Sequence, residues 1–201
     1  MRSGAMSRAT SNDPFERFGK FFDDAAATGI DDPNAMVVSS VDAAGAPSSR
    51  VILLKDFDAE GFVFYTNLES RKATELRRNP RAALCVYWAS LDKQIRVEGV
   101  VEPVEAGEAD TYFDSRPRGS QLGAWTSKQS APLASRKDLL ARYLKIQARF
   151  AAKKVPRPQF WGGFRVIPDR IEIWHNQNHR LHDRFLYLHT DEGWSVQRLY
   201  P

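Results

Sequence analysis

The sequence predicts a mainly β protein with peripheral helices, arranged as a small β-barrel. From Ala35 onward, short runs rich in β-branched and aromatic residues are separated by turn residues. The connections between these runs are short and contain Gly, Asp or Ser, which is typical of hairpins. Only a few stretches carry apolar residues at helical spacing. Many antiparallel strands joined by tight turns, with a few helices outside them, favour a small barrel.

The first predicted helix begins at Asp13, whose side chain can cap it, with Pro14 at the first helical position. Glu16 completes a pattern similar to a capping box, and Gly29 is a typical end for the helix. The apolar residues that recur at helical spacing along this segment are Phe15, Phe18, Phe22 and Ala25.

Five strands and one helix are predicted for the next part of the chain. The helix is capped by Ser70, turns Leu76 inward and ends at Asn79-Pro80. The connections at 42–45, 58–61 and 90–93 have the composition of hairpin turns. The predicted strands lie near residues 35–41, 50–55, 62–66, 82–88 and 94–103.

The rest of the chain is predicted to be helical first and then β. Residues 105–115 form one predicted helix, and residues 120–123 form a further turn. The segment 135–152 has an apolar stripe typical of an amphipathic helix, and Pro156-Arg157-Pro158 breaks it. The last predicted strands lie near residues 163–167, 170–174, 185–189 and 195–199.

The length and composition indicate one globular domain. The chain has 201 residues, of which 42% are hydrophobic and 27% charged, and these values exclude a largely disordered chain. We expect residues 1–12 to be a flexible N-terminal tail and residues 13–201 to form a single domain. The longest apolar run, residues 82–89, is too short to cross a bilayer, so no membrane association is expected.

The single cysteine indicates a cellular location, and the modest positive charge bears on the kinds of partner. Cys85 has no partner for an intramolecular disulfide, so a reducing cytoplasm is the expected location. The formal net charge of +4 is compatible with nucleic acid, a membrane surface or small anionic ligands. The basic residues form no continuous stripe and are mixed with acidic ones, so we expect no nucleic-acid partner.

Three clusters of basic and hydroxyl residues lie where predicted strands end and helices begin. Free N–H groups at a helix N-terminus and nearby cations both favour phosphate. Any one cluster is better explained as solvated charge on a capped helix, but three in one domain favour phosphorylated ligands. The clusters are Arg50 with Lys55, then Thr66 with Ser70, Arg71 and Lys72, and then Arg116 with Arg118 and Ser120.

A denser cluster lies at residues 180–184. In an extended segment, alternation would place Arg180, His182 and Arg184 on one face. Such a row would hold a planar anion and permit proton transfer near neutral pH, although an exposed, charged edge strand explains it equally well. His175 and His179 lie close to His182, but no acidic or thiol partner accompanies them, so no metal site is expected.

Other chemistries find little support in the sequence. Cys85 lies in an apolar strand pattern, where a cysteine is more often part of the core than reactive. The GxSxG, Walker A and GxGxxG motifs are absent. Trp125 and Trp174 adjoin the polar clusters and could form the wall of a site for a flat aromatic ligand.

Read together, these segments resemble the pyridoxine (pyridoxamine) 5′-phosphate oxidase family of FMN enzymes. The resemblance runs in order from about Asp13 to Pro201. It implies an FMN-binding split β-barrel that forms a homodimer, with two FMN sites at the subunit interface. The matching segments are PNAM at 33–36, PSSRVILLK at 47–55, GFVFYTN at 61–67, SRKA at 70–73, YFDSRPRGSQLGAW at 112–125, QS at 129–130, PRPQFWGG at 156–163, RIEIW at 170–174 and RLHDR at 180–184.

The resemblance also implies roles for individual residues. The substrate phosphate would be held by Lys55, Tyr112, Arg116 and Ser120, while Arg180 and His182 would cover the pyridine ring as the catalytic pair. The FMN site would be formed by Arg50, Val51, Ile52, Leu53, Tyr65, Thr66, Arg71, Lys72, Gln94, Gln129, Ser130, Trp174 and Arg184.

The implied reaction converts pyridoxine 5′-phosphate or pyridoxamine 5′-phosphate to pyridoxal 5′-phosphate, with O2 reduced to H2O2. The flavin supplies the electron chemistry and the protein supplies position and charge. Another split-barrel flavin oxidase, such as a phenazine-biosynthesis enzyme, is the alternative, but those enzymes generally lack the Lys, Tyr, Arg and Ser phosphate set. The chain also departs from the family, because residues 1–12 lack the Arg-x-x-Tyr segment that can fold over the substrate.

Overall fold

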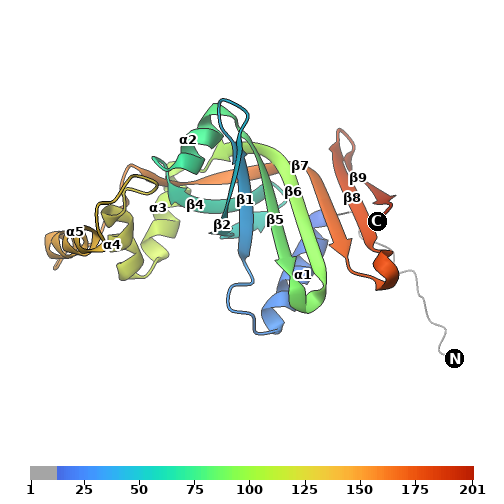
Figure 1. The fold of residues 1–201 in the computed structure, drawn as a ribbon, viewed down its shortest axis with the longest axis horizontal. Helices are drawn as coiled ribbons and strands as arrows, with labels where there is room; N and C mark the ends of the chain where they lie inside the picture. The colour runs from blue at the N-terminus through green and yellow to red at the C-terminus, as the bar shows by residue number, and fades with distance from the viewer. Residues whose placement is uncertain (1–12) are drawn as a thin grey trace.

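The structure is a computed structural model that describes residues 13–201, so the expected N-terminal tail lies outside the described residues. The strands hold more residues than the helices, and the helices lie around them (Figure 1). Two short 3₁₀ turns, Ala89–Leu91 and Asn178–Arg180, follow β5 and β7. The elements in chain order are α1 Pro14–Ala27, β1 Ala35–Val41, β2 Pro47–Leu53, β3 Asp56–Asp58, β4 Gly61–Asn67, α2 Arg71–Arg78, β5 Arg81–Trp88, β6 Lys93–Pro103, α3 Ala106–Ser115, α4 Arg118–Thr126, α5 Arg136–Arg149, β7 Trp161–His175, β8 Asp183–Thr190 and β9 Gly193–Leu199.

The described strands form one antiparallel sheet in the order β2-β1-β5-β6-β7-β4-β3, with β8 and β9 continuing from β7. β7 is the central element, because its first half pairs with β4 and its second half pairs with β8. Its other edge pairs with β6 along the whole length of that strand. The sheet therefore divides into two branches at β7, which confirms the expected split barrel.

A bend in β7 marks the place where the two branches separate. Pro168 lies opposite Gly99, and the register shifts between Glu98 and Gly99. A Cβ atom on Gly99 would lie 2.0 Å from the carbonyl oxygen of Ile167, so only glycine permits this approach. Two strands were predicted here, at 163–167 and 170–174, but residues 161–175 form one continuous strand.

The main core lies between the sheet and α1. Phe18 and Phe62 are fully buried with ring centroids 5.0 Å apart, and Phe18 also lies 5.8 Å from the ring of Trp88. The side chain of Asp13 accepts a hydrogen bond of 2.8 Å from the backbone N–H of Phe15, which confirms the predicted cap. The aromatic residues at helical spacing along α1 therefore pack against the sheet as part of the main core.

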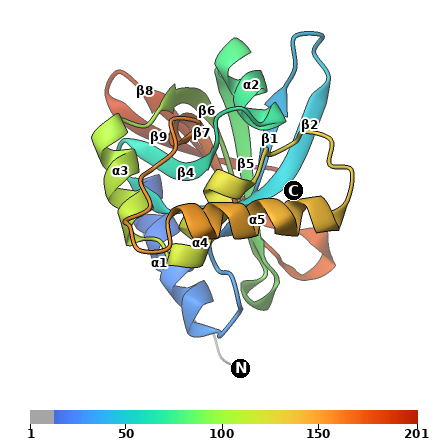
Figure 2. The same ribbon diagram turned by 90° about the vertical axis from the view of Figure 1, so that its left-hand side faces the viewer.

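A second, smaller core holds the three middle helices together. Phe113, Leu122, Phe150, Val155 and Trp161 form this cluster, and Trp161 attaches it to β7. Figure 2 shows α5 lying across the end of the barrel in front of α4. The apolar stripe expected along α5 is only partly used, because Leu140 and Leu144 are more than half exposed. Within residues 13–201, no helix is long and apolar enough to cross a membrane.

Candidate active site

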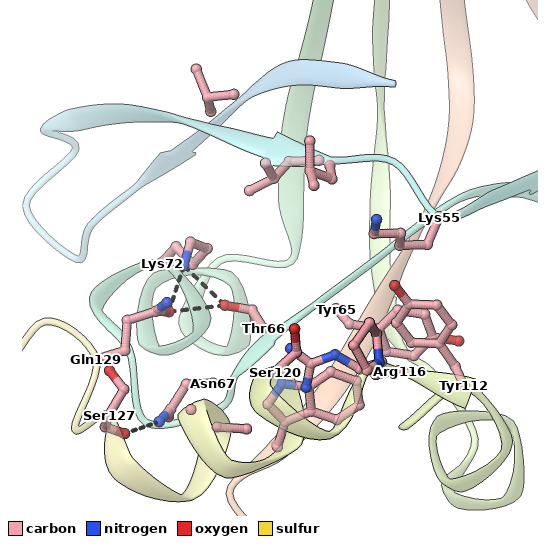
Figure 3. Close-up of a pocket in the computed structure, with 17 residues that line it drawn as sticks. Lys55, Tyr65, Thr66, Asn67, Lys72, Tyr112, Arg116, Ser120, Ser127 and Gln129 are labelled. Atoms are coloured by element: carbon pink, nitrogen blue, oxygen red, sulfur yellow. Dashed lines mark hydrogen bonds between the residues drawn. The ribbon is translucent and has the colours of Figure 1, made fainter. Parts of the chain in front are cut away.

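A cavity with a volume of about 610 Å³ lies between the sheet and the middle helices (Figure 3). Its wall is built by the end of β2, by β4, by the first turn of α2 and by α3 and α4. Eleven of the residues predicted for the site line this one cavity, and they are Val51, Ile52, Leu53, Lys55, Tyr65, Thr66, Lys72, Tyr112, Arg116, Ser120 and Gln129.

A buried amine lies at one end of this cavity. Ser70 caps α2 and thereby places Lys72 in its first turn, where the Nζ donates to Thr66 Oγ1 at 2.9 Å and Gln129 Oε1 at 2.8 Å. Burial, together with the charge of Arg50, lowers the pKa of Lys72 to about 8. Both acceptors are neutral, so this arrangement favours an anion as the ligand that would balance the amine.

A second hollow, of about 430 Å³, adjoins the amine. Gln129 lines both spaces, and Arg71 and Ser130 line the second one. The backbone N–H of Arg71 donates to Ser130 Oγ at 3.2 Å, and Ser130 has a φ of 72°. Arg50 is absent from the lining of either space, but its charge contributes to the lowered pKa of Lys72. The predicted cluster of Thr66, Ser70, Arg71 and Lys72 thus lies around the start of α2, together with Ser130.

The other end of the cavity is an aromatic stack. The ring centroid of Tyr65 lies 4.2 Å from that of Tyr112 and 5.3 Å from that of Trp161, and the planes are nearly parallel. The rings of Tyr112 and Trp161 are also nearly parallel, with centroids 6.2 Å apart. Burial raises the pKa of Tyr65, and its hydrogen bond to Glu108 adds to the effect. Gly163 permits the stack, because a Cβ atom there would lie 2.8 Å from Cδ1 of Tyr65. The site therefore contains a rigid, flat wall.

Arg116 continues this stack and carries an unpartnered donor. The residue caps the C-terminus of α3, and its Cζ lies 4.8 Å above the ring of Trp161. Burial lowers the pKa of Arg116, and among residues 13–201 its buried Nη1 has no hydrogen-bond partner. Lys55, Tyr112 and Ser120 line the same cavity. Together they provide the donors that an anionic group such as phosphate requires.

The remaining predicted residues form a separate group on β6, β7 and β8. Gln94 is paired with Trp174, and Trp174 is paired with Arg184, so the three form one row across the sheet. Arg184 makes an ion pair of 2.8 Å with the buried Glu172, and the ring of His182 lies 4.7 Å from that of Trp174. This group does not line the 610 Å³ cavity, and Figure 1 shows β8 and α4 at opposite ends of the molecule.

The segment 180–182 is not the extended strand that alternation required. Asn178–Arg180 is a 3₁₀ turn, Arg180 has a φ of 61°, and β8 begins only at Asp183. A left-handed arginine breaks the period of two, so the expected single face of Arg180, His182 and Arg184 is wrong. His182 is instead fixed locally, because its Nδ1 accepts a hydrogen bond of 3.2 Å from the backbone N–H of Gln177.

Two residues near the site were not singled out by the sequence analysis. Trp161 supports both Tyr65 and Arg116, and it stands inside the matching segment PRPQFWGG, which was the available signal. The second residue is Glu75, whose Oε1 makes an ion pair of 2.7 Å with Nε of Arg71. The i, i+4 spacing of Arg71 and Glu75 on a predicted helix was the only signal for this ion pair.

Solved structures with the same fold place the chain among the split-barrel proteins. PhzG from Burkholderia lata 383, in complex with tetrahydrophenazine-1-carboxylic acid, has a TM-score of 0.90 and 27% identity, and the match covers 98% of this chain and 100% of that one. A pyridoxamine 5′-phosphate oxidase-related, FMN binding protein from Nostoc punctiforme PCC 73102 has a TM-score of 0.74 and 15% identity, with the same coverage. The second likeness shows the fold alone.

The family follows from the sequence matches. The family model described as pyridoxamine 5′-phosphate oxidase matches residues 22–150, and the model described as the pyridoxine 5′-phosphate oxidase C-terminal dimerisation region matches residues 161–201. The chain therefore belongs to the pyridoxamine 5′-phosphate oxidase family, as the resemblance implied. A protein of Myxococcus xanthus DK1622 named pyridoxine/pyridoxamine 5′-phosphate oxidase is 59% identical over 94% of this chain and 92% of its own length. A protein of the same name from Rubrobacter xylanophilus is 48% identical over 100% and 92%.

Proposed function

We propose that this protein is an FMN-dependent oxidase that converts pyridoxine 5′-phosphate or pyridoxamine 5′-phosphate to pyridoxal 5′-phosphate. The observation that carries this proposal is the pair of anion-binding sets in one cavity, Lys72 at one end and Arg116 at the other. An enzyme with a phosphorylated cofactor and a phosphorylated substrate must hold two phosphates close together. The full-length relatives named above have this activity in their names.

The residues at the α2 end fit the phosphate of FMN. The buried amine of Lys72 donates to the neutral oxygens of Thr66 and Gln129, so a phosphate would supply the missing negative charge. Arg71 and Ser130 line the adjoining hollow and would complete the phosphate site. Val51, Ile52 and Leu53 line the cavity beside them, and the apolar side chains and backbone of this segment suit a flat ring.

The residues at the other end fit the phosphate of the substrate. The unpartnered Nη1 of Arg116 needs an acceptor, because a buried donor without one costs about 1–3 kcal/mol. Lys55, Tyr112 and Ser120 line the cavity around it and would supply further donors. These four residues favour a phosphorylated substrate over the substrates of a phenazine-type enzyme. A phenazine-type enzyme is the alternative that the likeness to PhzG favours.

We propose that the second group acts on the cavity of the partner subunit in a homodimer. Arg180, His182, Trp174 and Arg184 lie inside the dimerisation region. Figure 1 shows β8, which carries Arg184, at the far end of the molecule from α4. Val51 on β2 and Tyr87 on β5 are 66% and 55% exposed, and large apolar side chains of this kind favour a covering partner. Each of the two sites would then draw residues from both chains.

The proposed reaction removes a hydride equivalent from C4′ of the substrate. Bound FMN supplies the two-electron acceptor chemistry and the route by which O2 becomes H2O2. Arg180 would orient the pyridine ring and favour the negative charge that develops on it, while His182 would assist proton movement. For the amine substrate the balance is pyridoxamine 5′-phosphate, water and O2 giving pyridoxal 5′-phosphate, ammonia and H2O2. With a single cysteine, the chain suits the reducing cytoplasm as the place of this reaction.

The direct test is an anaerobic mixture of the FMN-loaded protein with pyridoxamine 5′-phosphate. We expect the flavin absorbance to bleach and to return when O2 is admitted, with one pyridoxal 5′-phosphate formed per flavin in the first cycle. Pyridoxamine without its phosphate is the matched control and should bleach the flavin far more slowly at equal concentration. Equal bleaching by both compounds would contradict the proposed role of Arg116 and its neighbours in binding the substrate phosphate. No bleaching by either compound would overturn the proposed function.

A further inference from the structure

A buried carboxylate lies directly beneath the cations assigned to the FMN phosphate. Glu75 is on α2 and only 4% exposed. Its Oε1 accepts a hydrogen bond of 2.7 Å from Nε of Arg71. Its Oε2 accepts hydrogen bonds of 2.5 Å from Ser40 and 2.7 Å from Ser48, and Nη2 of Arg50 lies 3.4 Å away.

The two serines connect the carboxylate to Arg50. Ser40 and Ser48 are opposite each other on β1 and β2, so both hydroxyls point to the same place. Nη1 of Arg50 donates to Ser40 Oγ at 2.6 Å, and Nη2 donates to Ser48 Oγ at 2.5 Å. Each serine therefore accepts from Arg50 and donates to Glu75. Among residues 13–201, the anion in the network that holds the guanidinium group is Glu75 alone.

This carboxylate also changes the charge of the cluster. Arg50, Arg71 and the protonated Lys72 carry three positive charges, and the charge of Arg50 adds to the effect of burial in lowering the pKa of Lys72. Glu75 reduces the net charge of the four groups to two positive charges. That value equals and opposes the charge of a phosphate dianion, so the cluster is balanced when phosphate is bound and tolerable before it binds.

We propose that Glu75 is the positioning residue of the FMN-phosphate site, holding the guanidinium groups of Arg50 and Arg71 in place before the phosphate arrives. This inference rests on the proposed function, because it assumes that these cations bind the phosphate of FMN. Glu75 itself repels a phosphate and acts only through the two arginines. An ordered pair of guanidinium groups loses less conformational entropy on binding, which strengthens the complex.

If Glu75 acts only through its charge, Glu75→Gln should have the opposite effect on FMN affinity from the one expected if Glu75 positions the arginines. One variant therefore distinguishes the two roles. If Glu75 acted only by its charge, Glu75→Gln would remove a negative charge near the phosphate and tighten FMN binding. If it positions the arginines, Glu75→Gln weakens FMN binding, because an amide has one acceptor oxygen and turns an N–H group toward Arg71 or the serines. We expect a loss of about tenfold in FMN affinity.

The experiment measures the dissociation constants of FMN and of riboflavin, which lacks the phosphate, for the FMN-free protein by flavin fluorescence. In Glu75→Gln we expect the FMN constant to rise while the riboflavin constant stays within about twofold. Glu69→Gln is the matched control, because Glu69 is an exposed carboxylate on the same hollow and the variant loses the same charge. Unchanged or tighter FMN binding in Glu75→Gln overturns the proposal, and so does an equal loss for both ligands.

Two further variants separate this inference from the proposed function. Lys72→Ala should weaken FMN and spare riboflavin if the phosphate binds at α2. If Lys72→Ala weakens FMN binding but Glu75→Gln does not, only the positioning role of Glu75 is wrong. If Lys72→Ala leaves the two constants unchanged, the phosphate lies elsewhere and both proposals fail. Ser48→Ala, which removes one donor to Glu75 and one acceptor of Arg50, should reproduce a smaller loss and serves if Glu75→Gln does not fold.

Discussion

The guanidinium carbon of Arg116 lies 4.8 Å from the centroid of the Trp161 ring, and the same tryptophan stacks on Tyr65 at 5.3 Å with planes 3° apart. Trp161 is 6% exposed and belongs to the core of the helical unit. One side chain therefore joins the packing of α3 and α4 to the position of the proposed substrate-phosphate donor. The position of the Arg116 guanidinium therefore depends on how Trp161 packs in that core.

Replacing Trp161 should therefore weaken substrate binding more than turnover. Trp161→Leu removes the surface on which Arg116 rests, so we expect KM for pyridoxamine 5′-phosphate to rise about 5–10-fold with a smaller change in kcat. The free energy of unfolding should also fall by roughly 2–4 kcal/mol, because the ring is buried. Trp125→Leu is the control, since Trp125 packs on Phe150 and has no ring contact to Arg116 among the described residues. An unchanged KM in Trp161→Leu would contradict the support of Arg116.

The pKa of Lys72 predicts a pH dependence of FMN binding. In the FMN-free protein, burial and Arg50 lower this pKa to about 8, and a bound phosphate would raise it because it favours the charged amine. We therefore expect FMN affinity to fall above pH 8, by up to about tenfold per pH unit, with uptake of a proton on binding. Calorimetric titrations in two buffers of different ionisation enthalpy measure this uptake. Lys72→Met and riboflavin should each abolish it, and uptake that persists in Lys72→Met would assign the proton to another group.

The folded state should lose stability in acid through Glu75. Burial alone would raise the pKa of this carboxyl, but hydrogen bonds from Ser40, Ser48 and Arg71 outweigh it and lower the pKa to about 2. A carboxyl with a lowered pKa stabilises the fold above its unfolded value of 4.5, and this contribution is lost as the pH falls toward 2. The expected slope reaches about 1.4 kcal/mol per pH unit for one proton. Urea unfolding between pH 5 and pH 3, with Glu75→Gln as control, should show this slope only in the unsubstituted protein.

Local signals were sufficient for most of the fold. The run Ala35–Val41 has the predicted bounds, and Ser70 caps α2 through a hydrogen bond to the backbone N–H of Ala73, as expected. The prediction failed at Pro168-Asp169, where the residues are typical of a turn but the strand continues. The partner strand makes this possible, because the bulge at Gly99 takes up the irregularity. A contact between distant segments is not visible in local sequence.

The site was harder to predict because its arrangement depends on long-range packing. The sequence placed Lys72 and Gln129 in one site by resemblance only, and the structure brings them within 2.8 Å. Their separation by 57 residues leaves no pattern to read. Glu75 was missed for the same reason, since its partners Ser40 and Ser48 lie on a different hairpin. The conformation of Arg180 was mispredicted because a positive φ is rare for arginine and has no sequence signature.

The proposed division of the site between two subunits predicts complementation between inactive variants. Lys72→Ala damages the cavity group, and Arg184→Ala damages the group on β8. If each site draws on both chains, a heterodimer of the two variants contains one site with both defects and one native site. Mixing the variants under conditions of subunit exchange should restore up to about one quarter of the native activity.

The control for this experiment is a mixture of two variants of the same group, such as Lys72→Ala with Arg116→Ala. In that mixture every site retains one defect, so no activity should return. No recovery in the Lys72 and Arg184 mixture despite verified exchange would show that each site is formed within one chain. Recovery in the control would show that Lys72 and Arg116 do not reach the same site from the same chain.

Arg116 and Arg180 should fail in different ways when each is replaced by alanine. Arg116 is proposed to hold the substrate phosphate, which does not change during the reaction, so Arg116→Ala should raise KM about tenfold or more and affect kcat less. Arg180 is proposed to face the reacting ring, where charge redistributes as the C4′ hydrogen leaves. Its interaction is strongest in the transition state, so Arg180→Ala should lower kcat on the order of 10²-fold. Steady-state kinetics with both substrates measures the difference.

The flavin content of the two variants provides the internal control. Neither residue is assigned to FMN, so both purified variants should keep the flavin absorbance of the unsubstituted protein. Arg180 adopts a left-handed backbone conformation with a φ of 61°, which alanine also disfavours, so Arg180→Gly separates loss of the side chain from backbone strain. If Arg116→Ala lost mainly kcat while Arg180→Ala lost only affinity, the two roles would be reversed. If neither constant changed in either variant, the substrate would lie outside this cavity.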